Sequence, residues 1–557
     1  MRAPKASTQQ LAIAHNGGVI ASRVRFVGTP ARPGQRQLPG GSTVAYRDPR
    51  DQTTRGRGYP MRTFAIRPRC RRGGIARTAT ALAGTSLLGL GLAAASPPPA
   101  SATSSTELYV TASGTKAGPC SISKPCGSVS RAVVVADHEP FNFTPVVINI
   151  GRGHFVTSLN FPDMSYPEPM LTISGVSPSA TTLAGNGSSA VLYALADAPR
   201  MTIQDLTITG GSAPVHDGGN FMNFLDVTFS HNAPGGALFD DGGTMSVSGS
   251  TFTNNALTTA TSGGGAISEV GGSLAIVGSL FTGNSVKGAR TASGGAIYVN
   301  DGHLSIAGST ITRNAATGSA GGGAIGIDQS GRTTVIGSTI NANTAAGPGG
   351  LVSATAGATI SFGADILVGN TGAGGSVCSG GGDSDLGYNV IDQSTCSMGT
   401  KTKVTTSAAV GLLPLAPNGG PTHTERIRKS SAAHDVISVA AKLAGTSFCS
   451  RQDQRGVPRK QGPATSCDAG GYQFAPPVIT SISPLKGPPG TEVTIKGYGF
   501  DFLALRFGSA APSVVVSGGQ TASTVVPKLG RATATIALSN PDGHASTRFD
   551  VLPLKTT

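Results

Sequence analysis

Short runs in which apolar and polar residues alternate recur through the middle of this 557-residue chain. Two of them are residues 296–299 (AIYV) and 303–307 (HLSIA). Alternation of this kind is typical of a strand with one buried face. No helical periodicity lies between the runs, so the pattern predicts an all-β chain of short strands joined by turns.

Two short phrases repeat through this region with a shared period. One places an apolar residue three positions before an Asn, and the other is Gly-Gly followed by an apolar residue. The Asn residues of the first phrase are 23, 29, 30, 29 and 27 positions apart, at Asn232, Asn255, Asn284, Asn314, Asn343 and Asn370. A unit of two or three short strands cannot bury its apolar face alone, so the repeat predicts stacked coils that form a parallel β-solenoid.

The repeated residue types suit such coils. We expect the Asn side chains to stack in a ladder, each amide bonding the turn and the next Asn; a binding role for the row is the alternative. The paired glycines are expected to supply positive φ at corners. Before the repeats, residues 128–137 predict a short amphipathic helix that covers the open end of the stack.

These phrases resemble the repeats of chlamydial polymorphic outer-membrane proteins and related secreted right-handed parallel β-helix proteins. The resemblance covers roughly residues 107–398 and implies a right-handed β-helix over residues 103–400, with an N-terminal cap. It is specific for the fold and does not indicate an activity.

Residues 401–474 carry a different set of motifs. The segments 415–422 (LAPNGGPT), 453–459 (DQRGVPR) and 467–472 (CDAGGY) resemble the choice-of-anchor Q domain, which closes many bacterial β-helix surface proteins. The resemblance implies a C-terminal cap. Arg455 and Asp468 are expected to pair within it.

Residues 476–553 predict a separate module. About seven short alternating strands with Gly- and Pro-rich turns indicate a β-sandwich. Their order resembles the IPT/TIG immunoglobulin-like fold, which in extracellular proteins serves adhesion, glycan contact or spacing. The fold class expected for the whole chain is therefore all-β: a right-handed parallel β-helix followed by an Ig-like β-sandwich.

The charge of the chain is concentrated at its start. The formal net charge is +14, and the first 77 residues hold 16 Lys and Arg against Asp48 and Asp51. Residues 61–102 follow the order of a secretory signal peptide, with a basic segment, a short apolar run and a small-residue cleavage site. We therefore expect translation to start at Met61 and residues 1–60 to be a disordered basic extension. An uncleaved membrane anchor is the alternative interpretation of this segment. Apart from it, we expect no integral membrane segment and no nucleic-acid partner. We expect the mature chain to be secreted, extracellular or at the cell surface.

The chain has seven cysteines, of which Cys70 falls in the predicted signal peptide. An even set of six remains, which suits an oxidising compartment. Six cysteines allow fifteen connectivities, and sequential pairing closes the shortest loops. We expect the pairs Cys120–Cys126, Cys378–Cys396 and Cys449–Cys467. Metal binding by these residues is disfavoured because no CxxC motif or His cluster accompanies them.

Parallel β-helices also host polysaccharide-cleaving enzymes, which use clustered carboxylates, often with Ca²⁺. When the coils are aligned on the Gly-Gly phrase, Asp240 and Glu269 share a register, and His216 and Asp217 lie nearby. These four are the candidate catalytic residues. Because Val299 and Ile327 occupy the same register in the next coils, the row stops, and turn chemistry is the competing interpretation. Apart from Ca²⁺ at this row, no metal or cofactor is expected.

Two functions follow from these observations. The first is a secreted, non-enzymatic surface protein that binds a cell-surface glycan or protein ligand for adhesion. The second is a secreted polysaccharide lyase or glycoside hydrolase on a β-helix scaffold. Aromatic residues make up only 5% of the chain, which disfavours the enzyme because sugar subsites use stacking rings. A purely structural wall component is a third hypothesis.

Overall fold

The computed structural model describes residues 10–15, 18–23, 105–138, 144–161, 170–195, 198–212, 215–258, 263–288, 293–318, 321–393, 396–530 and 533–553. The chain divides into two units, residues 1–85 and 86–557. The predicted signal peptide, residues 61–102, and the predicted start at Met61 lie outside the described residues. None of the helices in the described ranges has the length and apolar character needed to cross a bilayer.

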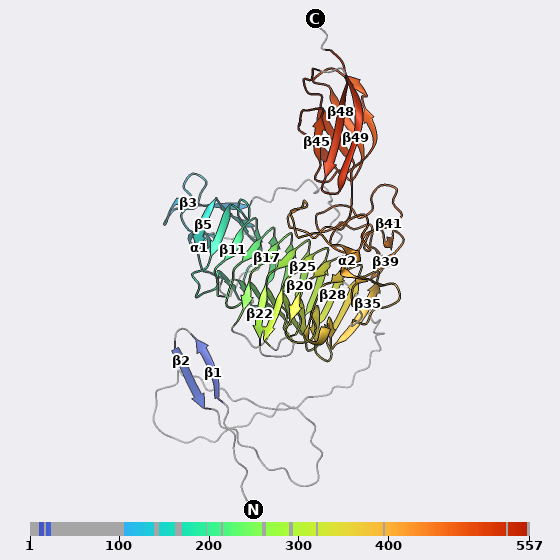
Figure 1. Ribbon diagram of the computed structural model, residues 1–557. Helices are drawn as coiled ribbons and strands as arrows, with labels where there is room; N and C mark the ends of the chain where they lie inside the picture. The colour runs from blue at the N-terminus through green and yellow to red at the C-terminus, as the bar shows by residue number, and fades with distance from the viewer. Residues whose placement is uncertain are drawn as a thin grey trace, which may run out of the picture. The chain divides into compact units, whose positions relative to one another are not determined.

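The first unit contains a hairpin that the sequence analysis did not predict. Strands β1 (Gln10–His15) and β2 (Gly18–Arg23) pair antiparallel, as Figure 1 shows. The prediction that residues 1–60 lack regular structure is wrong at this place. Two alternating runs flank Asn16-Gly17, which is a strong short-range signal for a hairpin turn.

The second unit begins with a stack of coils whose strands form three long parallel sheets (Figure 1). Sheet 1 contains β3 (Thr106–Thr115), β4 (Val146–Ile150), β7 (Leu171–Ser174), β10 (Met201–Gln204), β13 (Phe221–Leu225), β16 (Thr244–Ser248), β20 (Ser273–Val277), β24 (His303–Ala307), β28 (Arg332–Ile336), β32 (Thr359–Gly363) and β35 (Gly382–Gly387). Sheet 2 contains β5 (Gly153–Val156), β8 (Thr181–Ala184), β11 (Thr207–Thr209), β14 (Thr228–Ser230), β17 (Thr251–Thr253), β21 (Leu280–Thr282), β25 (Thr310–Thr312), β29 (Thr339–Asn341), β33 (Ile366–Val368), β36 (Val390–Ile391) and β37 (Lys403–Val404).

Sheet 3 completes each coil. It contains β6 (Leu159–Phe161), β9 (Leu192–Ala194), β12 (Val215–Asp217), β15 (Leu238–Asp241), β19 (Ile267–Val270), β23 (Ile297–Asn300), β27 (Ile325–Asp328), β31 (Val352–Ala354) and β34 (Cys378–Ser379). In four coils, an extra short strand follows the sheet 2 strand and precedes the sheet 3 strand along the chain. These strands form a short fourth sheet: β18 (Ala256–Leu257), β22 (Ser285–Gly288), β26 (Ala315–Gly318) and β30 (Thr344–Ala345). The predicted parallel solenoid is confirmed, and each coil pairs its backbone with the coils on either side.

The interior of the solenoid is filled by the alternate residues of each strand. In β16, Met245 and Val247 are buried and their neighbours are not. Sheet 2 contributes a stack of phenylalanines in which the ring of Phe252 lies 4.5 Å from that of Phe229 and 4.6 Å from that of Phe281, centroid to centroid. Identical residues therefore stack at the repeat of the coil, which keeps the register fixed.

The predicted Asn ladder is present and enclosed. The side-chain amide of each of the first five Asn residues donates to the side-chain oxygen of the Asn in the next coil at 2.9 Å. All six residues have no exposed surface: Asn232, Asn255, Asn284, Asn314, Asn343 and Asn370. The same amides donate to carbonyls of sheet 2 strands in the preceding coil, as from Asn255 to Phe229 and from Asn284 to Phe252, so these buried polar groups have partners.

The structure contains a second ladder that the sequence analysis missed. The backbone N–H of Ser250 donates to the hydroxyl of Ser279, that of Ser279 to Ser309, and that of Ser309 to Ser338, each at 3.2 Å. Each of these serines lies five positions before a ladder Asn and follows a glycine. This recurring Gly-Ser phrase was the signal that identifies the ladder.

The prediction about the paired glycines is wrong for the central coils. Gly236 has a positive φ of 80°, but Gly264, Gly265 and Gly294 do not adopt this conformation. A Cβ on Gly264 would lie 1.9 Å from the carbonyl oxygen of Ile267, and one on Gly294 would lie 1.7 Å from that of Ile297. Close approach of two backbones, and not φ, requires glycine there.

Helix α1 (Val129–His138) packs beside β3, β4 and β6 at the first coil. Its apolar face buries Val129, Ala132 and Ala136, which confirms the predicted helix. The three sequential disulfides are also confirmed: Cys120–Cys126, Cys378–Cys396 and Cys449–Cys467. Short loops of six and eighteen residues are closed by these bonds.

Residues 412–474, called the clasp from here on, lie against the outer face of sheet 2. The preceding segment contains η1 (Ala373–Gly375) and α2 (Ser407–Val410). The clasp has two small antiparallel pairs, β38 (Ile437–Ser438) with β41 (Ser466–Cys467) and β39 (Lys442–Leu443) with β40 (Thr446–Ser447). Its apolar residues form a second core with Ile366 and Val368 of β33.

The C-terminal module is the predicted β-sandwich. One sheet contains β42 (Val478–Ser483), β44 (Glu492–Tyr498), β47 (Thr521–Val525) and β46 (Val515–Ser517). The other contains β43 (Lys486–Gly487), β49 (Gly543–Val551), β48 (Thr533–Asn540) and β45 (Ala504–Phe507). Inward residues of both sheets, among them Ile495, Phe507 and Ile536, form its core.

Candidate functional site

Three adjacent strands of sheet 3 bring the predicted carboxylates together. Asp217 of β12 is in register with Asp240 of β15, and Asp240 is in register with Glu269 of β19. Neighbouring strands lie about 4.8 Å apart. The predicted pairing of Asp240 with Glu269 is therefore confirmed, and Asp217 extends the row to three residues, called the carboxyl row below.

The carboxyl row faces the interior of the solenoid. Asp217, Asp240 and Glu269 each have no exposed surface. The same register continues with Val299 and Ile327, which belong to the apolar core. Alternation along each strand turns these candidate catalytic residues inward, so they do not face the outside of the solenoid.

Few hydrogen-bond donors reach the row. Asp217 Oδ1 accepts from the backbone N–H of Asn220 at 2.9 Å and from its side-chain amide at 3.0 Å. Asp240 Oδ1 accepts from the backbone N–H of Gly243 at 2.8 Å. The second oxygen of each Asp, and both oxygens of Glu269, lack a donor of good geometry.

The turns that follow these strands leave room for the carboxyl groups. A Cβ on Gly243 would lie 2.5 Å from Asp240 Oδ1, and one on Gly272 would lie 2.7 Å from Glu269 Oε1. At Gly243 the carboxyl row itself therefore requires glycine. At Gly272 the backbone of the preceding coil does so as well, because the same Cβ would lie 2.4 Å from the carbonyl oxygen of Gly243.

Burial governs the ionisation of the row. Desolvation raises the pKa of Asp217, Asp240 and Glu269 above the usual carboxyl range. The neighbouring Asp240 carboxyl raises the pKa of Glu269 further, whereas the interaction with Glu269 opposes the rise at Asp240. Burial therefore favours the protonated form of these groups at pH values where surface carboxyls are ionised.

His216 lies on the other side of sheet 3. Its ring stacks between Tyr193 and Phe239, with centroids 4.7 Å and 5.0 Å away. Desolvation lowers the pKa of His216, against the attraction of Asp241 and Asp217. The structure thus separates this histidine from the carboxyl row by the thickness of the sheet. Because the three rings stack on one another, His216 offers no free ring face to a sugar.

A Ca²⁺ ion requires six to eight oxygen ligands. The described residues hold one set of three metal-ligating side chains whose ligand atoms lie within 4.8 Å of one another, and it is His434, Asp435 and Asp468 of the clasp. It is not the carboxyl row. Ca²⁺ at the row stays a prediction.

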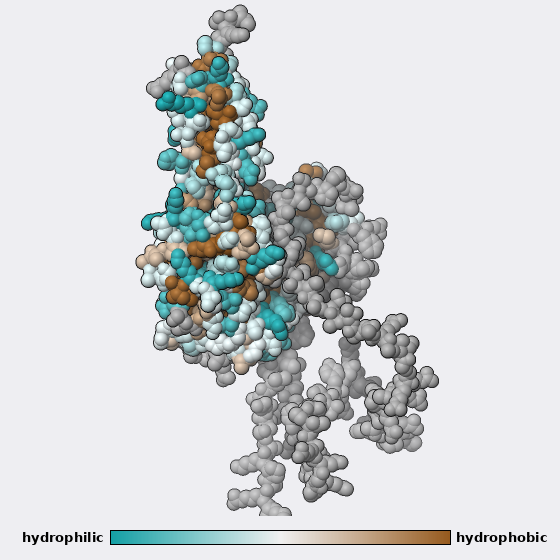
Figure 2. Space-filling view, turned by 90° about the vertical axis from the view of Figure 1, so that its right-hand side faces the viewer, coloured by the Kyte–Doolittle hydropathy of each residue, from teal (hydrophilic) through white to brown (hydrophobic). Residues whose placement is uncertain are grey.

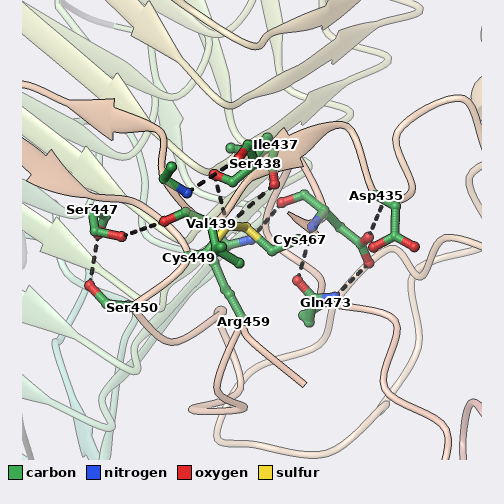
Figure 3. Close-up of a disulfide and its surroundings, with 12 residues drawn as sticks. Asp435, Ile437, Ser438, Val439, Ser447, Cys449, Ser450, Arg459, Cys467 and Gln473 are labelled. Atoms are coloured by element: carbon green, nitrogen blue, oxygen red, sulfur yellow. Dashed lines mark hydrogen bonds between the residues drawn. A yellow bond between two sulfur atoms is a disulfide. The ribbon is translucent and has the colours of Figure 1, made fainter. Parts of the chain in front are cut away.

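Asp468 is already saturated by donors of the clasp. It accepts from His434 Nδ1 and from the Asp435 backbone N–H, both at 2.8 Å. Its other oxygen accepts from the Gln473 amide at 3.0 Å and from the Phe474 backbone N–H at 2.6 Å. Figure 3 shows two of these partners, Asp435 and Gln473, beside the Cys449–Cys467 bond. The set is therefore a structural centre that fixes the clasp.

The predicted pairing of Arg455 with Asp468 is wrong. Arg455 pairs with Asp453, with Nη2 to Oδ2 at 2.7 Å and Nε to Oδ2 at 3.0 Å. Its guanidinium carbon lies 3.6 Å from the centre of the Tyr472 ring. Asp453 is only two residues from Arg455 in the sequence. Arg455 therefore pairs with this local residue and not with the more distant Asp468.

Comparison with known proteins agrees with this architecture. Residues 212–391 match the family described as right handed beta helix region, and residues 477–551 match the IPT/TIG domain. No curated protein sequence matches the chain.

One similar solved structure is a rhamnogalacturonan lyase, at 11% sequence identity and a TM-score of 0.31. The match covers 62% of this chain and 96% of that one. A similarity at this level carries no argument about function. The likenesses of residues 401–474 to choice-of-anchor Q domains and of the repeats to polymorphic outer-membrane proteins stay predictions. The chain contains a right-handed β-helix followed by a C-terminal IPT/TIG domain.

Proposed function

We propose that this chain is a secreted binding protein of the cell surface, in which the β-helix is a scaffold and the IPT/TIG module contacts a glycan or protein ligand. The observation that carries this proposal is the enclosure of the carboxyl row. Asp240 and Glu269 are the residues that the enzymatic hypothesis needs, and neither has any exposed surface. A polysaccharide outside the solenoid does not reach them.

The surface of the module supports a role in binding. Figure 2 shows hydrophobic surface gathered in a narrow stripe over the C-terminal module. Val515, at 70% exposure, and Val525, at 49%, are among its exposed large apolar side chains. Val515 pairs with Ser523 across β46 and β47, which places Val515 and Val525 on the same outer face. Contiguous exposed apolar surface marks interaction sites in soluble proteins.

The three disulfides support secretion, because such bonds persist in oxidising compartments. The predicted signal peptide is consistent with the same location. The enzymatic alternative, a polysaccharide lyase or hydrolase, is not favoured by any contact in the described residues.

Binding by the module is tested with a double variant, Val515→Asn with Val525→Asn, in the full chain. We expect retention on glycan and cell-surface protein arrays to fall at least about tenfold, since both side chains are exposed and contribute little to folding. A matched control is Val404→Asn, an exposed valine of β37 in the solenoid (60%). Equal loss with the control variant, or unchanged retention with the double variant, would remove the module from the proposal.

A further inference from the structure

The carboxyl row places three ionisable groups inside the solenoid with few hydrogen-bond donors around them. Three carboxyl groups share an enclosed space with two donating residues, Asn220 and Gly243. Both oxygens of Glu269 and Oδ2 of Asp240 have no donor of good geometry, although none of these atoms contacts solvent. Buried carboxylates without donors or counter-ions are strongly unfavourable, so the row cannot be fully ionised.

The strand register and the missing hydrogen-bond donors indicate where a proton would stabilise the row. Asp240 and Glu269 are paired residues of adjacent strands. Asp240 Oδ1 already accepts from Gly243, which leaves Oδ2 without a donor. A single proton between the two side chains supplies a donor to Oδ2 of Asp240 and removes the charge of Glu269.

We propose that Glu269 is protonated at neutral pH and donates a hydrogen bond to the Asp240 carboxylate, and that the solenoid loses stability when this proton is titrated. The proton removes a buried negative charge that a bound cation would otherwise neutralise and that an apolar side chain at this position would avoid. The pair joins β15 to β19, two successive strands of sheet 3, and therefore acts across the seam between two coils.

The surrounding charges favour this state. Asp217 on β12 and Asp241 on β15 both disfavour a second negative charge, and His216 acts on Asp217 from the outer face. On the far side, β23 presents the apolar Val299. No basic residue among the described ones is paired with the row by an ion pair.

The sign of the pH effect follows from proton linkage. Burial and the neighbouring Asp240 carboxyl place the folded pKa of Glu269 above its unfolded value. The native state therefore binds more protons than the unfolded state over this range. Stability is fully present below the unfolded pKa and is lost as pH rises, with the unfolding equilibrium constant increasing up to about tenfold per pH unit for one proton.

The test is urea unfolding of the full chain between about pH 5 and about pH 9, a range above the ordinary carboxyl pKa. Three proteins are compared: wild type, E269Q and D301N. The glutamine amide keeps a donor toward Asp240 but has no proton to lose. We expect the unfolding constant of wild type to rise more steeply with pH than that of E269Q. D301N, which changes an exposed carboxyl in the turn after β23, should keep the wild-type slope.

Groups outside the row that have raised pKa values, among them Asp365 and His434, are present in all three proteins and cancel in the comparison. Infrared difference spectra of native wild type and E269Q at neutral pH give an independent readout, in which wild type should show one more protonated-carboxyl C=O band. If E269Q does not fold, the same band in wild type should disappear reversibly as pH rises. Equal slopes, or no extra band, would overturn the proposal. So would a steep wild-type slope that disappears when EDTA is added, because a bound cation would then occupy the row.

Discussion

At the residue scale, the most repeated side chains of this protein are the most enclosed. The ladder Asn residues face no solvent, and each inner one is bonded to its neighbours in two coils. The residue before each ladder Asn has a positive φ, for example 56° at Arg313 and 55° at Ala342. The turn is therefore held by the Asn side chain against an unfavourable backbone conformation.

A ladder residue should be hard to replace. Asn284 donates to Asn314 Oδ1 and to the carbonyl of Phe252, both at 2.9 Å, and accepts from Asn255. Asn284→Ala leaves these buried groups without partners, so we expect a loss of about 2–4 kcal/mol in the free energy of unfolding by urea. The control, Asn223→Ala on the outer face of sheet 1, should cost less than about 0.5 kcal/mol. A similar small effect for both variants would contradict a structural ladder.

The sequence predicted which residues of the carboxyl row lie side by side, but not that their side chains point into the solenoid. Alignment on the Gly-Gly phrase placed Asp240 beside Glu269 correctly. The information on direction was also present, because Val299 and Ile327 occupy that register and only an inward position is apolar in successive coils. Charge suggested a surface site, whereas periodicity indicated the core, and periodicity was the stronger argument.

At the scale of elements, the clasp depends on contacts that a motif search does not see. Gln454 accepts from the hydroxyl of Thr310 at 2.5 Å and donates to that of Thr422 at 2.9 Å. Glu425 accepts from Thr312 and from Asn341, each at 3.0 Å. The hydrogen bonds that join the clasp to the solenoid connect residues that are 84 to 144 positions apart in the sequence. Sequence predicted the cysteine pairs, which are local, but not these contacts, which depend on the packed tertiary structure.

Removal of Gln454 should loosen the clasp. Gln454→Ala leaves the hydroxyl of Thr310 and the carbonyl of His423 without their partner. We expect about 2–3 kcal/mol lower stability and faster proteolysis within residues 412–474. Gln452→Ala is the matched control, because Gln452 is exposed two positions earlier. Cleavage at the same rate in both variants would show that the clasp is held by other contacts.

At the scale of the whole molecule, the protein combines a closed solenoid with a separate sandwich. Composition and repeat period were sufficient to predict this division, since each part has its own strand pattern and its own core. The predicted signal peptide, and most of the charged residues among the first 77, lie outside the described residues. What the sequence left open is whether the solenoid performs chemistry, and the enclosed carboxyl row bears on that question most directly.

The decisive measurement is cleavage of a panel of acidic and neutral polysaccharides by the full chain, followed through new reducing ends and unsaturated uronate products. Wild type, D240N and E269Q are compared, with retention of each polysaccharide measured in parallel. Because Asp240 and Glu269 have no exposed surface, we predict no cleavage that depends on either carboxyl group and unchanged retention by folded variants. Cleavage by wild type that is lost in folded D240N or E269Q would contradict the account.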